Sequence, residues 1–337
     1  MAAKRVRGAI VGASTLLGKE LADELSAATE SVWDITLLDA PDAELKITAA
    51  GDEAMVIQPI AADSFAGVDV VFFAGEGAAA LQFWKAAQAA GAAIIDLTGA
   101  LEAQPDVPVL SPLAGEVPTT HFATTVAVSA HPAAIMLALI SNKLRATGLE
   151  RIAATVLQPA SELGNAGVEE VHQQTVGLLS FQPLQKEIYD AQVAFNLVAS
   201  FGASSKANLQ TTRDKILRHT KLLTNDADDS VTLQLLQAPV FHGYTASVFV
   251  ELSQELDEQA LTRILVGQHS QLLEEEFPSN ELAAGKGEVL LRVTTAEAKK
   301  GSAFWLWMAA DNLRLSARNA AACATDLLRL KPKRTVQ

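Results

Sequence analysis

The sequence predicts an α/β protein of two domains, in which a doubly wound parallel sheet precedes an α+β domain with a mostly antiparallel sheet. The 337 residues of the chain exceed what a single hydrophobic core usually organises. Up to about residue 130, short apolar runs alternate with alanine-rich helical stretches, which is typical of strand–helix–strand units. Beyond that point, strands of alternating polarity predominate and indicate antiparallel pairing.

Composition and charge narrow the class of protein. The chain is 49% hydrophobic and 19% charged, so it can bury large cores and is not of the disordered class. A formal net charge of −13 argues against nucleic acid or an anionic membrane surface as the partner. No apolar run approaches the roughly 20 residues that a membrane-spanning helix needs. We therefore expect no nucleic-acid partner and no membrane partner.

The first residues resemble a short signal peptide, because Lys4, Arg5 and Arg7 precede an apolar run. Charged residues follow that run at once, at Lys19 and Glu20, and the pattern continues as an amphipathic helix. We interpret the run as a first strand with its turn, and we expect a cytoplasmic protein.

The first domain is predicted to span residues 1–130. Four apolar runs indicate buried parallel strands, at residues 6–11, 33–38, 68–74 and 92–97. Helices are predicted at 16–28 and 77–91, and Gly91 suits the C-cap of the second one. A terminal helix at 311–330 is expected to complete this domain.

The second domain is predicted to span residues 131–310, starting with a helix from about Pro132 to Thr147. Helices are also predicted at 167–180 and 257–268. Five segments indicate strands, at residues 151–158, 231–240, 245–252, 287–294 and 302–310. Apolar positions in the third and fifth of these strands suit a sheet that is apolar on more than one face. Such a sheet pairs with a second subunit, or the domain's own helices cover it.

Two glycines, Gly12 and Gly18, lie in the turn that joins the first strand to the first helix. A dinucleotide-binding turn uses three glycines, and the free N–H groups of the following helix hold the pyrophosphate. Thr15 replaces the middle glycine here, so an ordinary α/β turn is an equal interpretation. If the turn binds NAD or NADP, the expected contact residues are Gly12, Ser14, Thr15, Leu16, Leu17 and Gly18.

An acidic residue, Asp39, ends the second predicted strand. A carboxylate at this position suits the ribose 2′-OH and favours NAD as the cofactor. Together with Asp42 and Glu44, it would repel the additional phosphate of NADP. The alternative interpretation is a solvated acidic loop.

Seven segments, in order along nearly the whole chain, resemble motifs of the aspartate-semialdehyde dehydrogenase family. They lie at residues 11–21, 92–112, 126–136, 154–161, 193–198, 238–251 and 309–320. VGASTLLGKEL, for example, is similar to the family's VGATGAVGxxL, and APVFHGYTASVFVE is similar to VPVxxGHSEAVxVE. The best resemblance is to the divergent Usg-type branch, which lacks the active-site cysteine. It implies a Rossmann-like NAD(P)-binding domain, a dimerisation domain and a homodimer, and it adds Asn312 to the cofactor-binding residues.

The resemblance also implies that most of the family's active-site residues are replaced. The nucleophilic cysteine corresponds to Pro132, give or take one residue, and Pro132 carries no nucleophile and suits the first turn of a helix. Tyr244 replaces the general-base histidine, and a tyrosine titrates only at about pH 10. Gln237 and Glu102 replace two arginines that hold the substrate carboxylate and phosphate. Gln158 is retained.

Other residues near these positions suggest different chemistry. Ser129 with His131 or His242 would suit hydrolysis, and the two histidines with a carboxylate would suit a metal ion. No orienting third group, nucleophile elbow or metal-ligand spacing supports either interpretation, so we expect no metal. The single cysteine, Cys323, excludes an intramolecular disulfide, and we expect it to be buried in the terminal helix.

Two functions from different classes follow. In the first, the chain is an aspartate-semialdehyde dehydrogenase homologue without dehydrogenase activity, acting as a dinucleotide-binding or regulatory homodimer, or in association with a true dehydrogenase. In the second, it is an active NAD(P)-dependent semialdehyde oxidoreductase of amino-acid biosynthesis. The missing nucleophile favours the first, because removal of a covalent nucleophile typically costs many orders of magnitude in rate.

Overall fold

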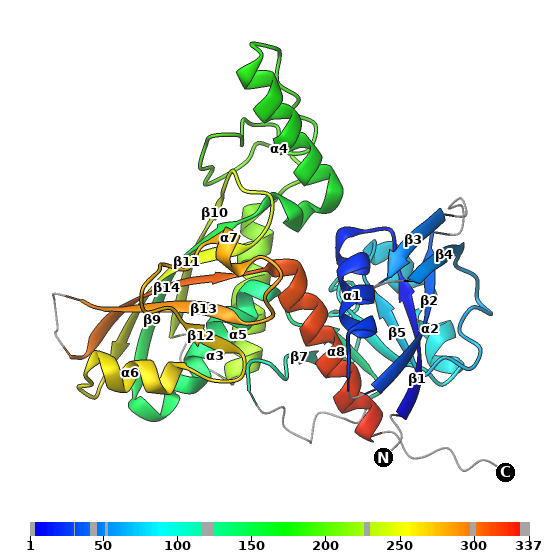
Figure 1. The fold of residues 1–337 in the computed structure, drawn as a ribbon, viewed down its shortest axis with the longest axis horizontal. Helices are drawn as coiled ribbons and strands as arrows, with labels where there is room; N and C mark the ends of the chain where they lie inside the picture. Colours follow the sequence, from blue (N-terminus) through cyan, green and yellow to red (C-terminus); the bar gives the residue numbers. More distant parts are fainter. Residues whose placement is uncertain are drawn as a thin grey trace. The chain divides into compact units, whose positions relative to one another are not determined.

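The chain divides into two compact units, which we describe separately (Figure 1). Unit 1 comprises Met1–Ala130 and Ser316–Gln337, and unit 2 comprises His131–Leu315. The computed structural model describes residues 4–29, 31–40, 46–50, 53–115, 124–225, 230–296 and 301–330. Within this part of the chain, no helix combines the length and the apolarity needed to cross a bilayer.

Unit 1 is built on an eight-stranded sheet with the order β3-β4-β2-β1-β5-β6-β8-β7. Its strands are β1 (Lys4–Val11), β2 (Ser31–Asp39), β3 (Lys46–Ala50), β4 (Glu53–Pro59), β5 (Val70–Phe73), β6 (Ala93–Asp96), β7 (Val109–Leu110) and β8 (Val126–Ser129). Every pairing is parallel except the one between β3 and β4. The predicted doubly wound parallel sheet is therefore confirmed, and β3, β4 and β7 are strands that the sequence pattern did not indicate.

Both faces of this sheet are buried. Successive side chains of a strand point to opposite sides, so each strand contributes residues to both cores. Val6 and Ile10 of β1 face one core, which helix α1 (Leu16–Ser26) covers. Ala9 and Val11 face the other core, which helix α2 (Gly77–Ala89) covers. This two-sided burial explains why the strands read as continuous apolar runs in the sequence.

The last helix, α8 (Asn312–Leu330), closes the first of these cores. The residues of α8 that are buried in this core recur at the three- and four-residue spacing of one helix face. They are Ala317, Ala320, Cys323, Ala324 and Leu327. Cys323 is buried among them, as the sequence predicted, and burial raises the pKa of its thiol well above the usual range.

Unit 2 contains a six-stranded mixed sheet with the order β10-β9-β11-β14-β13-β12. Its strands are β9 (Leu149–Gln158), β10 (Val231–Gln237), β11 (Tyr244–Leu252), β12 (Ser270–Leu272), β13 (Val289–Thr295) and β14 (Ala303–Ala310). The three central pairings are antiparallel, as expected, whereas the two outer pairings are parallel.

Helices cover one face of the unit 2 sheet. Helix α3 (Pro132–Leu144) is apolar on nearly all sides because it packs against β9 and against helices α5 (Leu209–Thr224) and α6 (Glu258–Leu265). The short helix α7 (Asn280–Ala283) contacts β14 from the opposite face, where Ala283 packs against Leu290 and Ala309. On the other face of the sheet, Phe249 and Trp305 lie opposite each other with ring centroids 5.0 Å apart, and Trp305 is 48% exposed.

An arm of unit 2 extends away from the sheet around helix α4 (Gly164–Leu179) (Figure 1). Two buried side chains of α4 hold the loop that follows. The Glu170 carboxylate accepts hydrogen bonds from the backbone N–H groups of Glu187, Ile188 and Tyr189. Gln174 Oε1 accepts from those of Val193 and Ala194. The loop forms no sheet or helix, so these side chains supply the hydrogen-bond acceptors that its backbone N–H groups need.

Candidate functional site

The turn between β1 and α1 in unit 1 requires both of its glycines for backbone packing. Gly12 has φ +89°, and a Cβ on it would lie 2.3 Å from the Cα of Gly75. A Cβ on Gly18 would lie 2.2 Å from the carbonyl oxygen of Gly12. The glycines therefore permit a tight strand-to-helix turn, which is one of the requirements of a dinucleotide-binding turn.

Thr15 uses its hydroxyl group within the turn. Its Oγ1 accepts a hydrogen bond from the Gly18 N–H at 3.0 Å and lies 2.8 Å and 2.9 Å from the carbonyl oxygens of Gly12 and Ala74. Thr15 is thus the N-cap of α1. Among the described residues, the next two amides, of Leu16 and Leu17, have no hydrogen-bond acceptor, and an anion such as a pyrophosphate would accept from them.

Asp39 lies beside this turn, because β2 pairs in parallel with β1 and Leu38 pairs with Val11. The Asp39 carboxylate accepts one hydrogen bond, from the Ala40 N–H at 3.0 Å, through Oδ1. Its Oδ2 has no partner among the described residues and suits a ribose hydroxyl. Asp42 and Glu44 lie outside the described residues. The residues present therefore fit a dinucleotide.

In unit 2, three predicted site residues form one row across the sheet. Gln237 of β10 pairs with Gln158 of β9, and the register of β9 with β11 places Tyr244 next to Gln158 on the other side. All three side chains are buried. Along a strand, side chains two residues apart point to the same face of the sheet. Gln158 therefore shares a face with the buried Val156, and Gln237 and Tyr244 likewise lie two residues from a buried position of their own strands.

The two glutamines hold each other in a fixed orientation. Gln237 Nε2 donates to the backbone carbonyls of Gln158 at 3.0 Å and Ala238 at 3.1 Å, so its Oε1 must face Gln158. Gln158 Nε2 then donates to Gln237 Oε1 at 3.1 Å. Gln158 Oε1 consequently has no partner among the described residues, although it is buried. An unsatisfied buried acceptor of this kind costs about 1–3 kcal/mol.

Glu162 connects the row to the start of helix α3. Its carboxylate accepts a hydrogen bond from the Tyr244 hydroxyl at 2.8 Å and lies 3.0 Å from His131 Nε2. His131 is the N-cap of α3, and its Nδ1 accepts from the Ala133 N–H at 3.2 Å. Because Nδ1 is an acceptor, we assign the proton to Nε2, which donates to Glu162. The His131 and Tyr244 rings meet edge to face.

The ionisation of this cluster is fixed by its contacts. Burial by itself would raise the pKa of Glu162, but His131, the two hydrogen bonds and the Lys215 charge outweigh it and lower that pKa. Burial, and then the Glu162 carboxylate, raise the pKa of Tyr244 well above its usual value. At neutral pH, Glu162 is therefore a carboxylate and Tyr244 a protonated phenol.

Two family models match the chain across both units. The model "Semialdehyde dehydrogenase, NAD binding domain" matches residues 7–117, and "Semialdehyde dehydrogenase, dimerisation domain" matches residues 142–315. The chain belongs to the semialdehyde dehydrogenase family. The resemblance inferred from the sequence, and the assignment to the Usg-type branch, are confirmed by these matches and by the relatives described next.

Relatives of both kinds cover nearly the whole chain. The "USG-1 protein homolog" of Azotobacter vinelandii is 29% identical over 95% of this chain and 97% of its own length. The "Aspartate-semialdehyde dehydrogenase" of Bacillus subtilis is 24% identical over 96% of this chain and 97% of its own. The crystal structure of aspartate semialdehyde dehydrogenase II from Vibrio cholerae, complexed with ASA, superposes with a TM-score of 0.86. It is 25% identical and covers 98% of this chain and 100% of its own.

Of the five residues that the sequence analysis matched to family active-site positions, four lie in unit 2: Gln158, Gln237 and Tyr244 in the row, and Pro132 in the first turn of α3. The fifth, Glu102, lies in unit 1 in the turn that follows β6. Pro132 occupies the helical position where its missing N–H has no cost, as the sequence predicted. Unit 2 contains no cysteine, because the single cysteine of the chain, Cys323, lies in unit 1.

The sequence analysis missed Glu162, His219 and the role of His131 as a cap. His219 of α5 is fully buried, and its Nδ1 accepts the backbone N–H of His131 at 3.0 Å. A carboxylate four residues after Gln158 was visible in the sequence, but nothing local showed that it meets Tyr244. Asn312 lies in unit 2, where its Oδ1 accepts from the Gly243 N–H at 2.8 Å.

The contacts give no support to a Ser–His hydrolase or a metal site. The Ser129 hydroxyl accepts a hydrogen bond from Asn319 within unit 1 at 2.9 Å. Both ring nitrogens of His131 already have partners, and His242 is exposed. Among the described residues, no group of three or more His, Cys, Asp or Glu side chains is placed to hold a metal ion.

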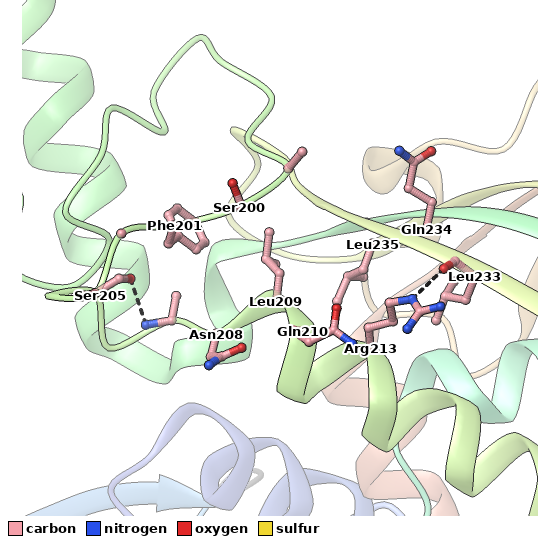
Figure 2. A pocket seen from close by; sticks show the side chains of 14 residues that line it. Ser200, Phe201, Ser205, Asn208, Leu209, Gln210, Arg213, Leu233, Gln234 and Leu235 are labelled. Atoms are coloured by element: carbon pink, nitrogen blue, oxygen red, sulfur yellow. Dashed lines mark hydrogen bonds between the residues drawn. The ribbon is translucent and has the colours of Figure 1, made fainter.

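A cavity of about 620 Å³ lies elsewhere in unit 2, between the loop before α5, the first turns of α5, and the edge strand β10 (Figure 2). Figure 2 shows Arg213 beside this edge, where its Nε donates to the Leu233 carbonyl at 2.8 Å. None of the predicted site residues lines the cavity. The cavity and the row of family positions are therefore separate features of unit 2.

Proposed function

We propose that this chain is a homodimeric semialdehyde dehydrogenase homologue that lacks dehydrogenase activity and retains a dinucleotide-binding turn. The observation that carries the proposal is Pro132 in the first turn of α3, where the family resemblance places the nucleophilic cysteine. Cys323, the only thiol of the chain, is buried in the core of unit 1 with a raised pKa. A buried thiol of raised pKa is a poor nucleophile.

The surrounding residues support the same conclusion. A general base must lose its proton near the working pH, whereas the pKa of Tyr244 is raised and its hydroxyl donates to Glu162. Gln237 has a neutral amide where the resemblance implies a charged arginine guanidinium group. That amide already makes hydrogen bonds to two backbone carbonyls and to Gln158. The site therefore lacks a nucleophile, a base and a substrate clamp at once.

The decisive experiment is an assay with aspartate semialdehyde, phosphate and either NAD or NADP. We expect no reduced nicotinamide above background, while the Bacillus subtilis relative, assayed in parallel, turns over. Turnover within about a hundredfold of that enzyme would refute the proposal and favour the alternative, an active NAD(P)-dependent semialdehyde oxidoreductase. The observation that favours this alternative is the β1–α1 turn, whose residues fit a dinucleotide.

For the cofactor, we infer that the turn at Gly12 and the amides of Leu16 and Leu17 hold the pyrophosphate, and that Asp39 holds the ribose. NAD would supply a hydride acceptor when bound. Calorimetric titration should show tighter binding of NAD than of NADP, and Asp39→Ala should weaken NAD binding about tenfold. Equal affinities for the two cofactors would show that Asp39 does not read the ribose.

We propose that the second copy covers the sheet face of unit 2 that carries Phe249 and Trp305. The match to a dimerisation domain and the exposed aromatic pair support this choice. Trp305→Glu should give a monomer in analytical ultracentrifugation, whereas Val32→Glu, at an exposed apolar residue of unit 1, should leave the dimer intact. A dimeric Trp305→Glu protein would contradict this interface.

Association with a true dehydrogenase, and a cytoplasmic location, stay predictions from the sequence. Co-expression of this chain with the dehydrogenase of the same cell, each with a different tag, tests the first of them. Recovery of a mixed dimer would add a regulatory role to the proposed function. Recovery of the two homodimers alone would restrict the chain to self-association.

A further inference from the structure

Glu162 is a carboxylate that the proposed function leaves without a role, although it is the centre of the contacts around His131 and Tyr244. We propose that His131 Nε2 and the Tyr244 hydroxyl form a binding site for a small carboxylate, and that the chain's own Glu162 fills it. This inference rests on the proposed function in one respect only, namely the interpretation that the Glu162 carboxylate occupies a site that has lost its catalytic groups.

The two hydrogen-bond donors converge on the carboxylate from different elements of unit 2. Tyr244 begins β11 and donates at 2.8 Å to Oε2, while His131 precedes α3 and donates at 3.0 Å to Oε1. Each oxygen therefore has its own donor. Charge-assisted bonds of this kind are stronger than neutral ones, and Lys215 of α5 adds a favourable charge.

Both donors are held in place by contacts that do not involve Glu162. His131 is fixed through its Nδ1, which accepts from Ala133, and through its backbone N–H, which donates to His219. Tyr244 is fully buried in the second sheet, where its strand pairs on both sides. The donors would therefore keep their positions without the Glu162 side chain, which makes the site preorganised.

The carboxylate is also within reach of solvent. The Glu162 side chain is 22% exposed, whereas that of His131 is 4% exposed. A small anion thus has a route to the donors once the side chain is removed. Replacement of Glu162 by alanine removes Cγ, Cδ and the two carboxylate oxygens, and these four heavy atoms correspond to those of acetate.

The test uses the full-length Glu162→Ala protein and sodium acetate as the probe. We expect its Tm to rise by about 2–4 °C at an acetate concentration ten times its Kd, relative to sodium chloride at equal ionic strength. Formate should act more weakly because it lacks the methyl group, and butyrate should act more weakly because it is too long. The wild-type protein should show no acetate-specific shift, because Glu162 already fills the site.

Matched variants separate this site from general salt effects. Glu169→Ala removes an exposed glutamate of α4 and should show no acetate-specific shift. Adding Tyr244→Phe to Glu162→Ala removes one donor and should weaken acetate binding about tenfold. An equal acetate response in the wild type, in Glu169→Ala or in the double variant would overturn the proposal, as would no response in folded Glu162→Ala.

If Glu162→Ala does not fold in chloride, its refolding yield replaces the Tm as the measurement. A higher yield in acetate than in butyrate supports the proposal, and equal yields overturn it. Neither readout depends on dehydrogenase activity. The failure of this inference and the failure of the proposed function are therefore distinguishable, because only turnover of aspartate semialdehyde decides the latter.

Discussion

The β1–α1 turn of unit 1 and the row of buried residues in unit 2 differ in how much of the family pattern they keep. The turn keeps Gly12 and Gly18, and the structure gives each a packing reason that is independent of any ligand. The row keeps Gln158 alone, and Gln237 and Tyr244 are satisfied by neighbours within the chain. The family resemblance thus implies that residues needed by the backbone are retained, and that residues needed only for catalysis are replaced by a self-contained network.

The largest expected effect would come from the turn. Gly12→Ala should lower the free energy of unfolding by at least about 3 kcal/mol, because the new Cβ overlaps the Gly75 backbone and φ is positive. Gly285→Ala is the control, since φ there is +72° but nothing lies within 4 Å of the added Cβ. It should cost only about 1 kcal/mol. Equal losses in urea unfolding would show that the turn is not tightly packed.

The second prediction concerns Glu162 and pH. A carboxylate whose pKa is lower in the folded state than in the unfolded state stabilises the fold above the unfolded pKa of about 4.3. That contribution is lost as the pH falls through the folded pKa. Glu162→Gln should therefore be less stable than the wild type at pH 7, and the difference in Tm should shrink below about pH 4. A difference that does not vary with pH would show that the Glu162 charge is not used.

The glutamine pair should respond asymmetrically to replacement by methionine, which has a similar volume. Gln237→Met removes the donor of two backbone carbonyls and the acceptor of Gln158, so it should cost about 2–3 kcal/mol. Gln158→Met removes one unsatisfied acceptor and creates another, so it should cost less than about 1 kcal/mol. Equal losses in denaturant unfolding would contradict the assigned amide orientations.

The smallest expected effect is on catalysis. The double replacement Pro132→Cys with Tyr244→His would supply the nucleophile and the base that the family resemblance implies, but Gln237 would still offer no positive charge to an anionic substrate. Glu162 would also place a negative charge beside the new histidine. We expect no measurable dehydrogenase activity in the aspartate semialdehyde assay. Strong activity would show that the substrate-binding positions matter less than the catalytic ones.

Much of the fold could be predicted because it depends on local pattern. The apolar runs of unit 1 became parallel strands, and the three- and four-residue spacing in α8 explained the burial of Cys323. The strands β3 and β4 were missed because β3 has only five residues and the apolar run of β4 covers only residues 54–57. The pairing of β4 with β2, and of β3 with β4, is a tertiary contact that compensates for a weak local preference.

The sequence by itself determined the two-domain α/β architecture, the glycine turn and the helix start at Pro132, since each depends on residues within one or two turns of chain. Only the tertiary structure decided that Gln237, Gln158 and Tyr244 form one row, because strand register is a long-range property. It alone decided that Glu162 meets a tyrosine 82 residues away and a histidine 31 residues away. The residues next to a polar side chain in the sequence do not indicate which distant residue it will contact. The residues of a backbone turn are close together in the sequence, so the turn can be predicted from them.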